Sequence, residues 1–405
     1  MPRTQSSQQR KLTKRLSDIL IVLFVFFLPT QLGKHFFLPF SYISGVRVDY
    51  LAPAIYVTDI LAFLLILTHL NEYRAILKNK TVQMILFLLS LTLIVSLSRD
   101  FGLYKFLKVI ELLAIGGIFA SPQTNKKTVF YAFFWTALLQ LYIVLMQMVS
   151  QHSLGGDFYF LGERPLTLSM PGIAKAAIDG VQMLRPYGTF SHPNSMAGFF
   201  VAIYAYYLFH RLEVKPVAYW ALILISAALA VFSFSKIAIS VFFIVTLYYL
   251  MKQKKLGGNG SLRMVLITII TFVCALFFKA STDPLTVSKR LTLALDSISI
   301  IKSHWLLGVG LGNYLYAQGE FPQNYPSFIL QPVHNIVLLT AAELGIPISS
   351  YLLFLIFRYI SKKRMIALPI LCILATGMFD HYWLTLQQNW LLLGVMWGLL
   401  NTEVL

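Results

Sequence analysis

The stretch PVAYWALILISAALAVFSFSKIAISVFFIVTLYYLM, residues 216–251, decides the class of fold. Lys236 is its one charged residue, and this lysine divides it into two apolar runs. A membrane-spanning helix needs about 20 mostly apolar residues. The stretch therefore predicts two spans, 216–234 and 237–251, joined by a tight turn at Ser233-Phe234-Ser235-Lys236.

The same apolar character extends over the whole chain of 405 residues. Hydrophobic residues make up 58% of the chain and charged residues 12%, against about 45–50% and about 25% in soluble globular proteins. A soluble protein of this size could not bury so much apolar surface, and the composition also excludes disorder, collagen and a coiled coil. We therefore expect an all-α polytopic membrane protein, with residues 1–405 forming a single integral membrane domain.

Twelve segments have the length and composition of transmembrane helices. The first contains Ile19–Leu28, which follows a basic N-terminus but precedes no small-x-small cleavage site, so we expect an uncleaved span rather than a signal peptide. The others lie near 53–70, 82–98, 101–120, 128–150, 192–209, 216–234, 237–251, 263–279, 335–357, 365–380 and 385–402.

The distribution of basic residues predicts the orientation of these spans. Most of the 33 Lys and Arg residues lie in the N-terminus and in the even-numbered gaps between spans. By the positive-inside rule, both termini are then cytoplasmic. The net charge of +17 is explained by cations that flank spans beside anionic lipids, so we expect a lipid bilayer and no nucleic acid as partner.

Two exterior loops are too long and too apolar for passive linkers. The first covers 151–191, and the second and larger loop covers 280–334, between spans 9 and 10. Within the second, Leu285–Ile301 carries an apolar stripe at helical spacing, consisting of Val287, Leu291, Ala294, Ile298 and Ile301. This pattern predicts an amphipathic helix at the outer membrane interface.

Polar residues that are unusual near a membrane cluster on the predicted exterior side. Arg185-Pro-Tyr-Gly-Thr-Phe-Ser-His-Pro-Asn194 precedes a span, with Pro193 suited to the first helical turn and Ser191 or His192 to the cap. The free amides of that turn, together with Arg185, are able to hold a phosphate or pyrophosphate. A plain helix start with an interfacial arginine is the alternative.

Further clusters follow along the chain. Lys236 stands at a tight exterior turn, where its side chain either belongs to a binding site or simply extends to the membrane surface as a snorkelling lysine. Arg290 adjoins the amphipathic stripe. Gly308-Val-Gly-Leu-Gly312 follows no strand, so it predicts a tight turn and not a dinucleotide site.

His334-Asn335 opens a long helix, in which Glu343-Leu-Gly-Ile-Pro347 predicts a kink. Asp380-His381-Tyr382 lies at the last exterior turn.

Charges inside the predicted spans are few. Lys108 and Glu111 are three residues apart on one helix and are expected to pair. Cys274 and Cys372 each lie in an apolar run and are expected to be packing residues. The exterior side shows no pair of His, Cys or carboxylate residues at helical ligand spacing, so we expect no metal site.

Taken together, the exterior clusters resemble the O-antigen ligase and O-antigen polymerase superfamily of bacterial membrane glycosyltransferases. The matching pieces run in order through residues 185–345: Arg185-x-x-Gly-Thr-Phe-x-His-Pro-Asn194, Ser235-Lys236, Arg290 ahead of Gly308-Val-Gly-x-Gly312, and His334-Asn335 ahead of Glu343-Leu-Gly345. Lys236 departs from the pattern, because the family more often carries arginine after the serine. A bidentate phosphate contact at that position is therefore in doubt.

The resemblance implies a metal-independent, inverting transfer of a glycan from an undecaprenyl-diphosphate carrier to an acceptor hydroxyl, without a cofactor, on the outer face of the bacterial cytoplasmic membrane. It implies His334 as the general base, and Arg185, Arg290 and Lys236 as ligands of the donor diphosphate. Supporting roles fall to His192, Asn194, Asn335, Glu343 and Asp380. The acceptor is a glycan, a lipid or a protein.

Several alternatives stay open at the level of sequence. Within the superfamily, an O-antigen ligase, an O-antigen or exopolysaccharide polymerase and a protein O-oligosaccharyltransferase share the same donor chemistry. A transporter or flippase for a lipid or polysaccharide is the main alternative from another class. It predicts a polar path through the membrane and two related halves, and the sequence shows no evident internal repeat. A non-catalytic scaffold gives no reason for basic and histidine clusters on one side.

Overall fold

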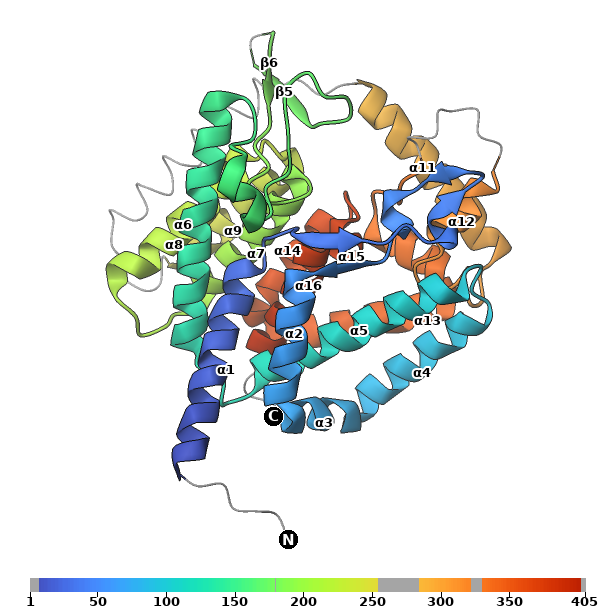
Figure 1. The fold of residues 1–405 in the computed structure, drawn as a ribbon. Coiled ribbons are helices and arrows are strands. Elements are labelled where there is room, and N and C mark those ends of the chain that lie inside the picture. The colour runs from blue at the N-terminus through green and yellow to red at the C-terminus, as the bar shows by residue number, and fades with distance from the viewer. Residues whose placement is uncertain (1–6, 179, 254–283, 322–329, 402–405) are drawn as a thin grey trace.

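The computed structural model of the chain describes residues 7–178, 180–253, 284–321 and 330–401 (Figure 1). The expected span at 263–279, with Cys274, lies outside these residues. The helices are α1 (Ser7–Phe27), α2 (Val57–Thr68), α3 (Leu70–Lys78), α4 (Lys80–Ile94), α5 (Arg99–Ala120), α6 (Lys126–Ser150), α7 (Pro193–Phe209), α8 (Pro216–Phe232), α9 (Lys236–Gln253), α11 (Pro284–Ser303), α12 (Tyr314–Gly319), α13 (Ile336–Lys363), α14 (Leu368–Gly377), α15 (Tyr382–Thr385) and α16 (Gln387–Leu400).

Helix α7 is the centre of the largest hydrophobic core. Nearly all of its residues are buried, because it is apolar on every side and α8, α9, α14 and α16 pack around it. Its first turn is joined to α16, since the Ser195 hydroxyl donates a hydrogen bond to the side chain of Asn389. The helix start that carries the first polar cluster is therefore fixed to a rigid support.

Close approach of α5 and α16 depends on small residues. A side-chain carbon at Gly398 would overlap the carbonyl oxygen of Gly116, and one at Gly394 would come within 2.8 Å of the carbonyl oxygen of Leu112. Small residues let helix backbones approach closely, and such contacts are typical of packing between membrane helices.

Among the described residues, six short strands add a feature that the all-α expectation did not include. Strands β1 (Gly33–His35) and β4 (Ala54–Tyr56) pair antiparallel, as do β2 (Tyr42–Ile43) with β3 (Val46–Arg47), and β5 (Lys175–Ile178) with β6 (Val181–Leu184). They form two-stranded ribbons in the connections before α2 and α7. The described residues are otherwise mostly helical and contain no closed sheet.

The helices agree with the expected spans in position more than in length. By length and composition, two helical stretches of the described residues are able to cross a membrane, Lys126–Ser150 and Ile336–Gly377. A third would be the α2–α3 pair, which bends by 88°. Others are shorter, and the 17 residues of α8 cover about 26 Å. The twelve-span layout and the orientation of the termini therefore stay predictions.

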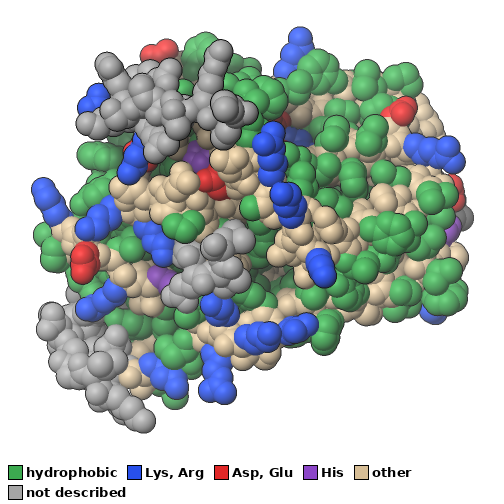
Figure 2. Space-filling model, turned by 90° about the horizontal axis from the view of Figure 1, so that it is seen from below, with side chains coloured by type: hydrophobic (Ala, Val, Ile, Leu, Met, Phe, Trp, Pro, Cys, Tyr) green, Lys and Arg blue, Asp and Glu red, His purple; other side chains and the backbone are tan. Residues whose placement is uncertain are grey.

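Basic side chains are spread over the end of the molecule where α1 begins. Figure 2 shows this face, on which Lys and Arg side chains are more frequent than Asp and Glu. The lower end of Figure 1 holds α3 and the start of α1, next to several of the basic gaps used to predict the cytoplasmic side. Such a face is typical of the cytoplasmic end of a membrane protein.

The expected amphipathic helix at 285–301 is α11. Its stripe residues Val287, Leu291 and Ile298 are exposed, while Leu293 and Ile300 pack into a small core with α12 and α13. An exposed apolar stripe is what a helix at a membrane interface presents to lipid. That location stays a prediction.

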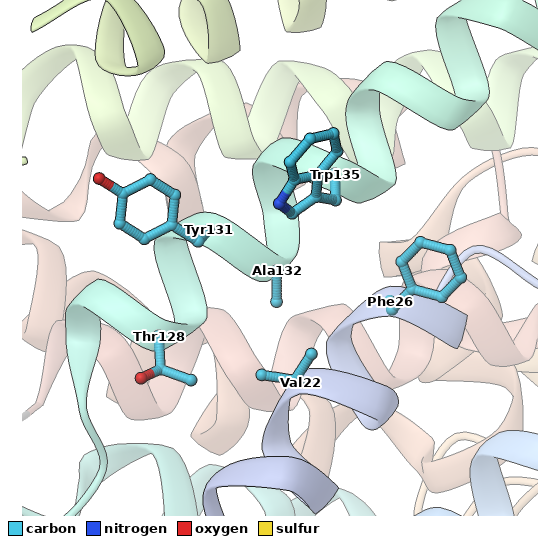
Figure 3. A pocket seen from close by; sticks show the side chains of 6 residues that line it. All are labelled: Val22, Phe26, Thr128, Tyr131, Ala132 and Trp135. Atoms are coloured by element: carbon cyan, nitrogen blue, oxygen red, sulfur yellow. The ribbon is translucent and has the colours of Figure 1, made fainter. Parts of the chain in front are cut away.

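A shallow apolar groove lies between α1 and α6. Figure 3 shows its lining, with Val22 and Phe26 from α1 and Tyr131, Ala132 and Trp135 from α6. Trp135 is exposed. None of the expected site residues lines this groove.

Candidate active site

The segment before α7 is held in place by two glutamines of α6. The Gln147 side-chain oxygen accepts hydrogen bonds from the backbone N–H groups of Tyr187 and Gly188, both at 2.9 Å, and its nitrogen donates to Glu163 at 2.7 Å. Gln140, two helical turns earlier, accepts from the N–H of Thr189 and donates to its hydroxyl. The polar segment is thus fixed from the side by buried amides.

The start of α7 follows the expected pattern. Pro193 is its first residue, and His192 is the N-cap, whose Nδ1 accepts a hydrogen bond from the Asn194 N–H at 3.1 Å. Proline suits this position because its missing N–H would have no helical partner. The cap prediction is confirmed. The side chain of Asn194, in this first turn, contacts both Arg185 and Asp380.

Arg185 joins two clusters that the sequence separates. Its Nε donates to the carbonyl oxygen of Ser233 at 2.9 Å, and its Nη2 donates to the Asn194 side-chain oxygen at 2.6 Å. Burial lowers the pKa of the guanidinium to about 10, with Arg290 adding to the decrease while Tyr187 and Asp380 oppose it. Arg185 therefore remains a cation at neutral pH and lies near Arg290.

Asn194 links Arg185 to Asp380 through its side-chain amide. The Asn194 Nδ2 donates to one carboxylate oxygen of Asp380 at 2.9 Å, while the other accepts from the backbone N–H of His381 at 2.9 Å and lies 3.1 Å from Nδ1 of His334. Burial alone would raise the pKa of Asp380. The hydrogen bond with His334 and the nearby charges of His334, His381 and His192 outweigh burial and hold it well below its usual range.

A second histidine lies beside His334. The ring centroids of His334 and His381 are 5.0 Å apart, and His381 Nδ1 is 2.7 Å from the Thr385 hydroxyl. Burial lowers the pKa of His381 to about 3, against the opposing effect of Asp380. Tyr50, which precedes β4, makes an edge-on contact with the ring of His381, with a centroid distance of 5.5 Å.

Arg290 reaches this cluster from α11. Its charge lowers the pKa of both Arg185 and His381, so its guanidinium is near both. Its Nε is buried and has no hydrogen-bond partner among the described residues. A buried donor without a partner is uncommon and calls for an explanation, such as a ligand that the structure does not contain.

Lys236 and Asn335 are located at helix starts beside the cluster. Lys236 is the first residue of α9, three residues after Ser233, whose carbonyl oxygen binds Arg185. Asn335 caps α13 by accepting from the N–H groups of Val337 and Leu338, and its amide donates to the carbonyl oxygen of Met378. It thereby joins the start of α13 to the segment that carries Asp380.

Glu343 lies away from the cluster, about 13 Å along α13 from His334. Its carboxylate accepts a hydrogen bond from the N–H of Gly312 at 2.9 Å. The expected kink is confirmed, because Gly345 has a φ of +76° within α13. Pro347 has no N–H, so the helix leaves backbone oxygens free at this point.

The glycine-rich turn satisfies those oxygens. The N–H groups of Val309 and Gly310 donate to the carbonyl oxygens of Ala342 and Glu343, both at 3.0 Å, and the Ile346 N–H donates to that of Trp305 at 2.7 Å. Gly308, Gly310 and Gly312 all have positive φ. The tight turn predicted here is confirmed, and it closes around the kink of α13.

Three potential metal ligands come together in the cluster. The ligand atoms of His334, Asp380 and His381 all lie within 4.8 Å of one another. Helical spacing could not reveal this set, because His334 is 46 residues from Asp380. In the structure the Asp380 oxygens accept from Asn194 and His381 and face His334. The expectation of no metal remains a prediction.

Sequence reasoning missed the residues that support the cluster from other helices. Gln140, Gln147 and Glu163 look like ordinary polar residues in the sequence. A weak signal existed, since two glutamines seven residues apart share one face of an otherwise apolar helix. The cluster of Arg185, His192, Asn194, Arg290, His334, Asp380 and His381 is called the exterior polar cluster below, after the side of the membrane on which the sequence predicts it.

Comparison with known proteins bears on this region directly. No curated protein matches the chain. Residues 187–349 match the family model described as O-antigen ligase. This range contains His192, Asn194, Arg290 and His334, whereas Arg185 lies two residues before it and Asp380 lies 31 residues after it. The match covers 163 of the 405 residues and supports membership of the O-antigen ligase and polymerase superfamily.

Proposed function

We propose that this protein is a membrane glycosyltransferase of the ligase type, which moves a glycan from an undecaprenyl-diphosphate carrier to an acceptor hydroxyl at the outer face of the bacterial cytoplasmic membrane. The O-antigen ligase domain supports a function of the ligase or polymerase kind. The observation that carries the proposal is the hydrogen-bonded chain from Arg185 through Asn194 and Asp380 to His334.

The geometry supplies a base with a defined tautomer. An ionised carboxylate only accepts hydrogen bonds, so the imidazole atom that faces Asp380, Nδ1, carries the proton of neutral His334. Its Nε2 then has the free lone pair. An acceptor hydroxyl attacks the anomeric carbon from the side opposite the leaving group and transfers its proton to Nε2 of His334.

The leaving group requires positive charge. As the bond between the anomeric carbon and the diphosphate oxygen breaks, that oxygen keeps the electron pair and the lipid diphosphate gains a charge. Arg185 and Arg290 are placed to neutralise it, and Lys236 adds a third cation at the start of α9. No step in this scheme requires a metal ion, and attack from the opposite face inverts the anomeric centre.

Two measurements test the proposal. Purified protein should join donor and acceptor glycans covalently in the presence of excess EDTA, and loss of activity in EDTA would contradict the metal-free scheme. His334→Ala should abolish transfer while leaving the binding of undecaprenyl diphosphate nearly unchanged. A variant that turns over like the wild type would exclude His334 as the base.

Other functions give different results in the same system. A transporter would move the lipid-linked glycan across proteoliposomes without forming a new glycosidic bond. Within the superfamily, a gene deletion followed by gel analysis of surface glycans distinguishes the acceptors. Free polymer that is no longer attached to the surface indicates a ligase, whereas single repeat units indicate a polymerase, and loss of protein-linked glycan indicates a protein O-oligosaccharyltransferase.

A further inference from the structure

We propose that His192 binds the diphosphate of the donor as a fixed hydrogen-bond donor, through its Nε2–H, and takes no part in proton transfer. The inference rests on the proposed function, and it assigns a specific contact to a residue that otherwise serves as a helix cap. It follows from the cap geometry and from the position of the ring in the exterior polar cluster.

The cap fixes the tautomer of His192. A backbone N–H is always a donor, so the Asn194 N–H, 3.1 Å from Nδ1, requires a lone pair on that atom. A neutral imidazole carries one proton, which is then on Nε2. His334 has the opposite arrangement, because its Nδ1 faces the carboxylate of Asp380. At Nε2, His192 therefore donates a hydrogen bond, whereas His334 has a free lone pair that can accept one.

The surroundings of His192 keep the ring neutral. Burial lowers its pKa to about 3, and the charges of Arg185, His334 and His381 add to this effect, while Asp380 opposes it. A neutral ring with a protonated Nε2 has no lone pair there, so it cannot act as a base at that atom. It offers the same donor at any pH well above 3.

The position of the ring is suited to a diphosphate. His192 is half-buried, and its Nε2 forms no hydrogen bond with the parts of the chain that the structure describes. The groups that influence its charge are those of the exterior polar cluster, including Arg185. The Nη2 of Arg185 is bonded to Asn194, two residues from His192. A diphosphate has enough acceptor oxygens to bind Arg185 and the imidazole together.

Two substitutions separate the cap from the donor. In His192→Asn the side-chain oxygen takes the place of Nδ1 and can cap α7, but nothing replaces Nε2–H. In His192→Gln the amide nitrogen extends to the place of Nε2, but the short cap is lost. We expect His192→Asn to bind undecaprenyl diphosphate at least about tenfold more weakly with an unchanged melting temperature. His192→Gln should melt earlier and bind within about threefold of the wild type.

Binding is measured with undecaprenyl diphosphate on the full chain in lipid nanodiscs, with the exposed His152→Asn as the matched control, which should change neither property. Normal binding by His192→Asn, or equal loss in both His192 variants, would overturn the assignment. If the wild type does not bind the probe, the proposed function fails as well.

A second measurement is independent of the ligand. Nitrogen NMR of the histidine-labelled protein should show Nε2 of His192 protonated and Nδ1 unprotonated, without change between neutral and mildly acidic pH. A proton on Nδ1 would overturn the inference and leave the role of His334 untouched.

Discussion

Nδ1 of His334 lies 3.1 Å from a carboxylate oxygen of Asp380, across 46 residues of sequence. The carboxylate is held by two further donors, the Asn194 amide and the His381 N–H. It therefore has little freedom to turn, and the imidazole that it faces is held in one orientation. In the proposed reaction this contact determines which nitrogen of His334 acts as the base.

Replacement of Asp380 by Asn tests that contact. The amide keeps the size of the side chain but loses the charge, and its NH₂ group can no longer accept a hydrogen bond, so the three donors around the Asp380 carboxylate cannot all be satisfied. We expect glycan transfer to fall by about 100-fold or more, as for a lost general base, with undecaprenyl diphosphate binding nearly unchanged. The exposed Asp157→Asn is the control and should transfer normally. Transfer by Asp380→Asn within tenfold of the wild type would show that orientation by Asp380 is unimportant.

Arg290→Lys keeps the charge of the side chain and removes its fork of donors. Nε of Arg290 is buried without a partner among the described residues, so a ligand that uses it would lose that bond. A hydrogen bond to a charged group is worth about 1.5–3 kcal/mol, which predicts a loss of about 10-fold to 100-fold in turnover. Lys302→Ala, at an exposed position of the same helix, is the control. A rate within twofold of the wild type would identify Arg290 as an interfacial anchor.

Local sequence patterns predicted the features that depend on local interactions. Pro193 after a capping residue marked the start of α7, and Gly345 with Pro347 marked the kink in α13. Lys108 and Glu111 form the expected pair, with their charged atoms 3.2 Å apart. These features could be read because the interacting groups are within a few residues of one another.

Contacts between distant segments could not be read in the same way. Asp59 lies 2.6 Å from the ammonium group of Lys108, although it precedes that residue by 49 positions. The pairing of His334 with Asp380 is of the same kind. Helix packing brings these residues together, and a single sequence does not report which helices are neighbours. Asp380 was expected to support the site, but its partner was unknown.

Replacement of Gln147 tests whether the buried glutamines of α6 stabilise the segment before α7. Alanine at this position would leave the N–H groups of Tyr187 and Gly188 buried without acceptors. Each unsatisfied group costs about 1–3 kcal/mol, so the stability of the folded protein should fall by at least about 2 kcal/mol. The measurement is a denaturation midpoint in detergent micelles, followed by intrinsic fluorescence. Gln123→Ala, at an exposed position, should have no effect. Equal midpoints for both variants would show that the hydrogen bonds of Gln147 do not stabilise the segment before α7.

Gly308, in the glycine-rich turn, and Gly45, between β2 and β3, provide a matched pair of substitutions. Gly308 has a φ of +69°, and a side-chain carbon there would overlap backbone atoms of Glu343. Gly45 has a φ of +78° with no atom within 4 Å of the added carbon. Gly45→Ala should cost about 1–2 kcal/mol for the left-handed backbone alone. Gly308→Ala should cost about 4 kcal/mol or more, because the turn can no longer pair with the free oxygens of α13. Equal costs would show that the turn does not need this close approach.

The half-buried imidazole of His192, whose folded pKa is lowered by burial, predicts how stability depends on pH. Its pKa is about 3 in the folded protein, because burial disfavours the charged ring, and 6.5 is the ordinary value. Between these values the unfolded chain binds a proton that the folded protein does not, so stability should decrease as the pH falls from about 6.5 toward 3. Asp380 does not contribute in the upper part of this range, because its folded pKa lies well below 3.8 and its contribution is lost only under more acidic conditions.

His192→Asn removes this titrating group while it keeps a cap for α7. The variant should therefore melt like the wild type at pH 7.5 and at a higher temperature than the wild type at pH 4.5, which gives a flatter curve of melting temperature against pH. His152→Asn, at an exposed position, should follow the wild-type curve. Parallel curves for His192→Asn and the wild type would mean that the ring can accept a proton in the folded protein at little cost, and the interior around the start of α7 would then have to be open to water.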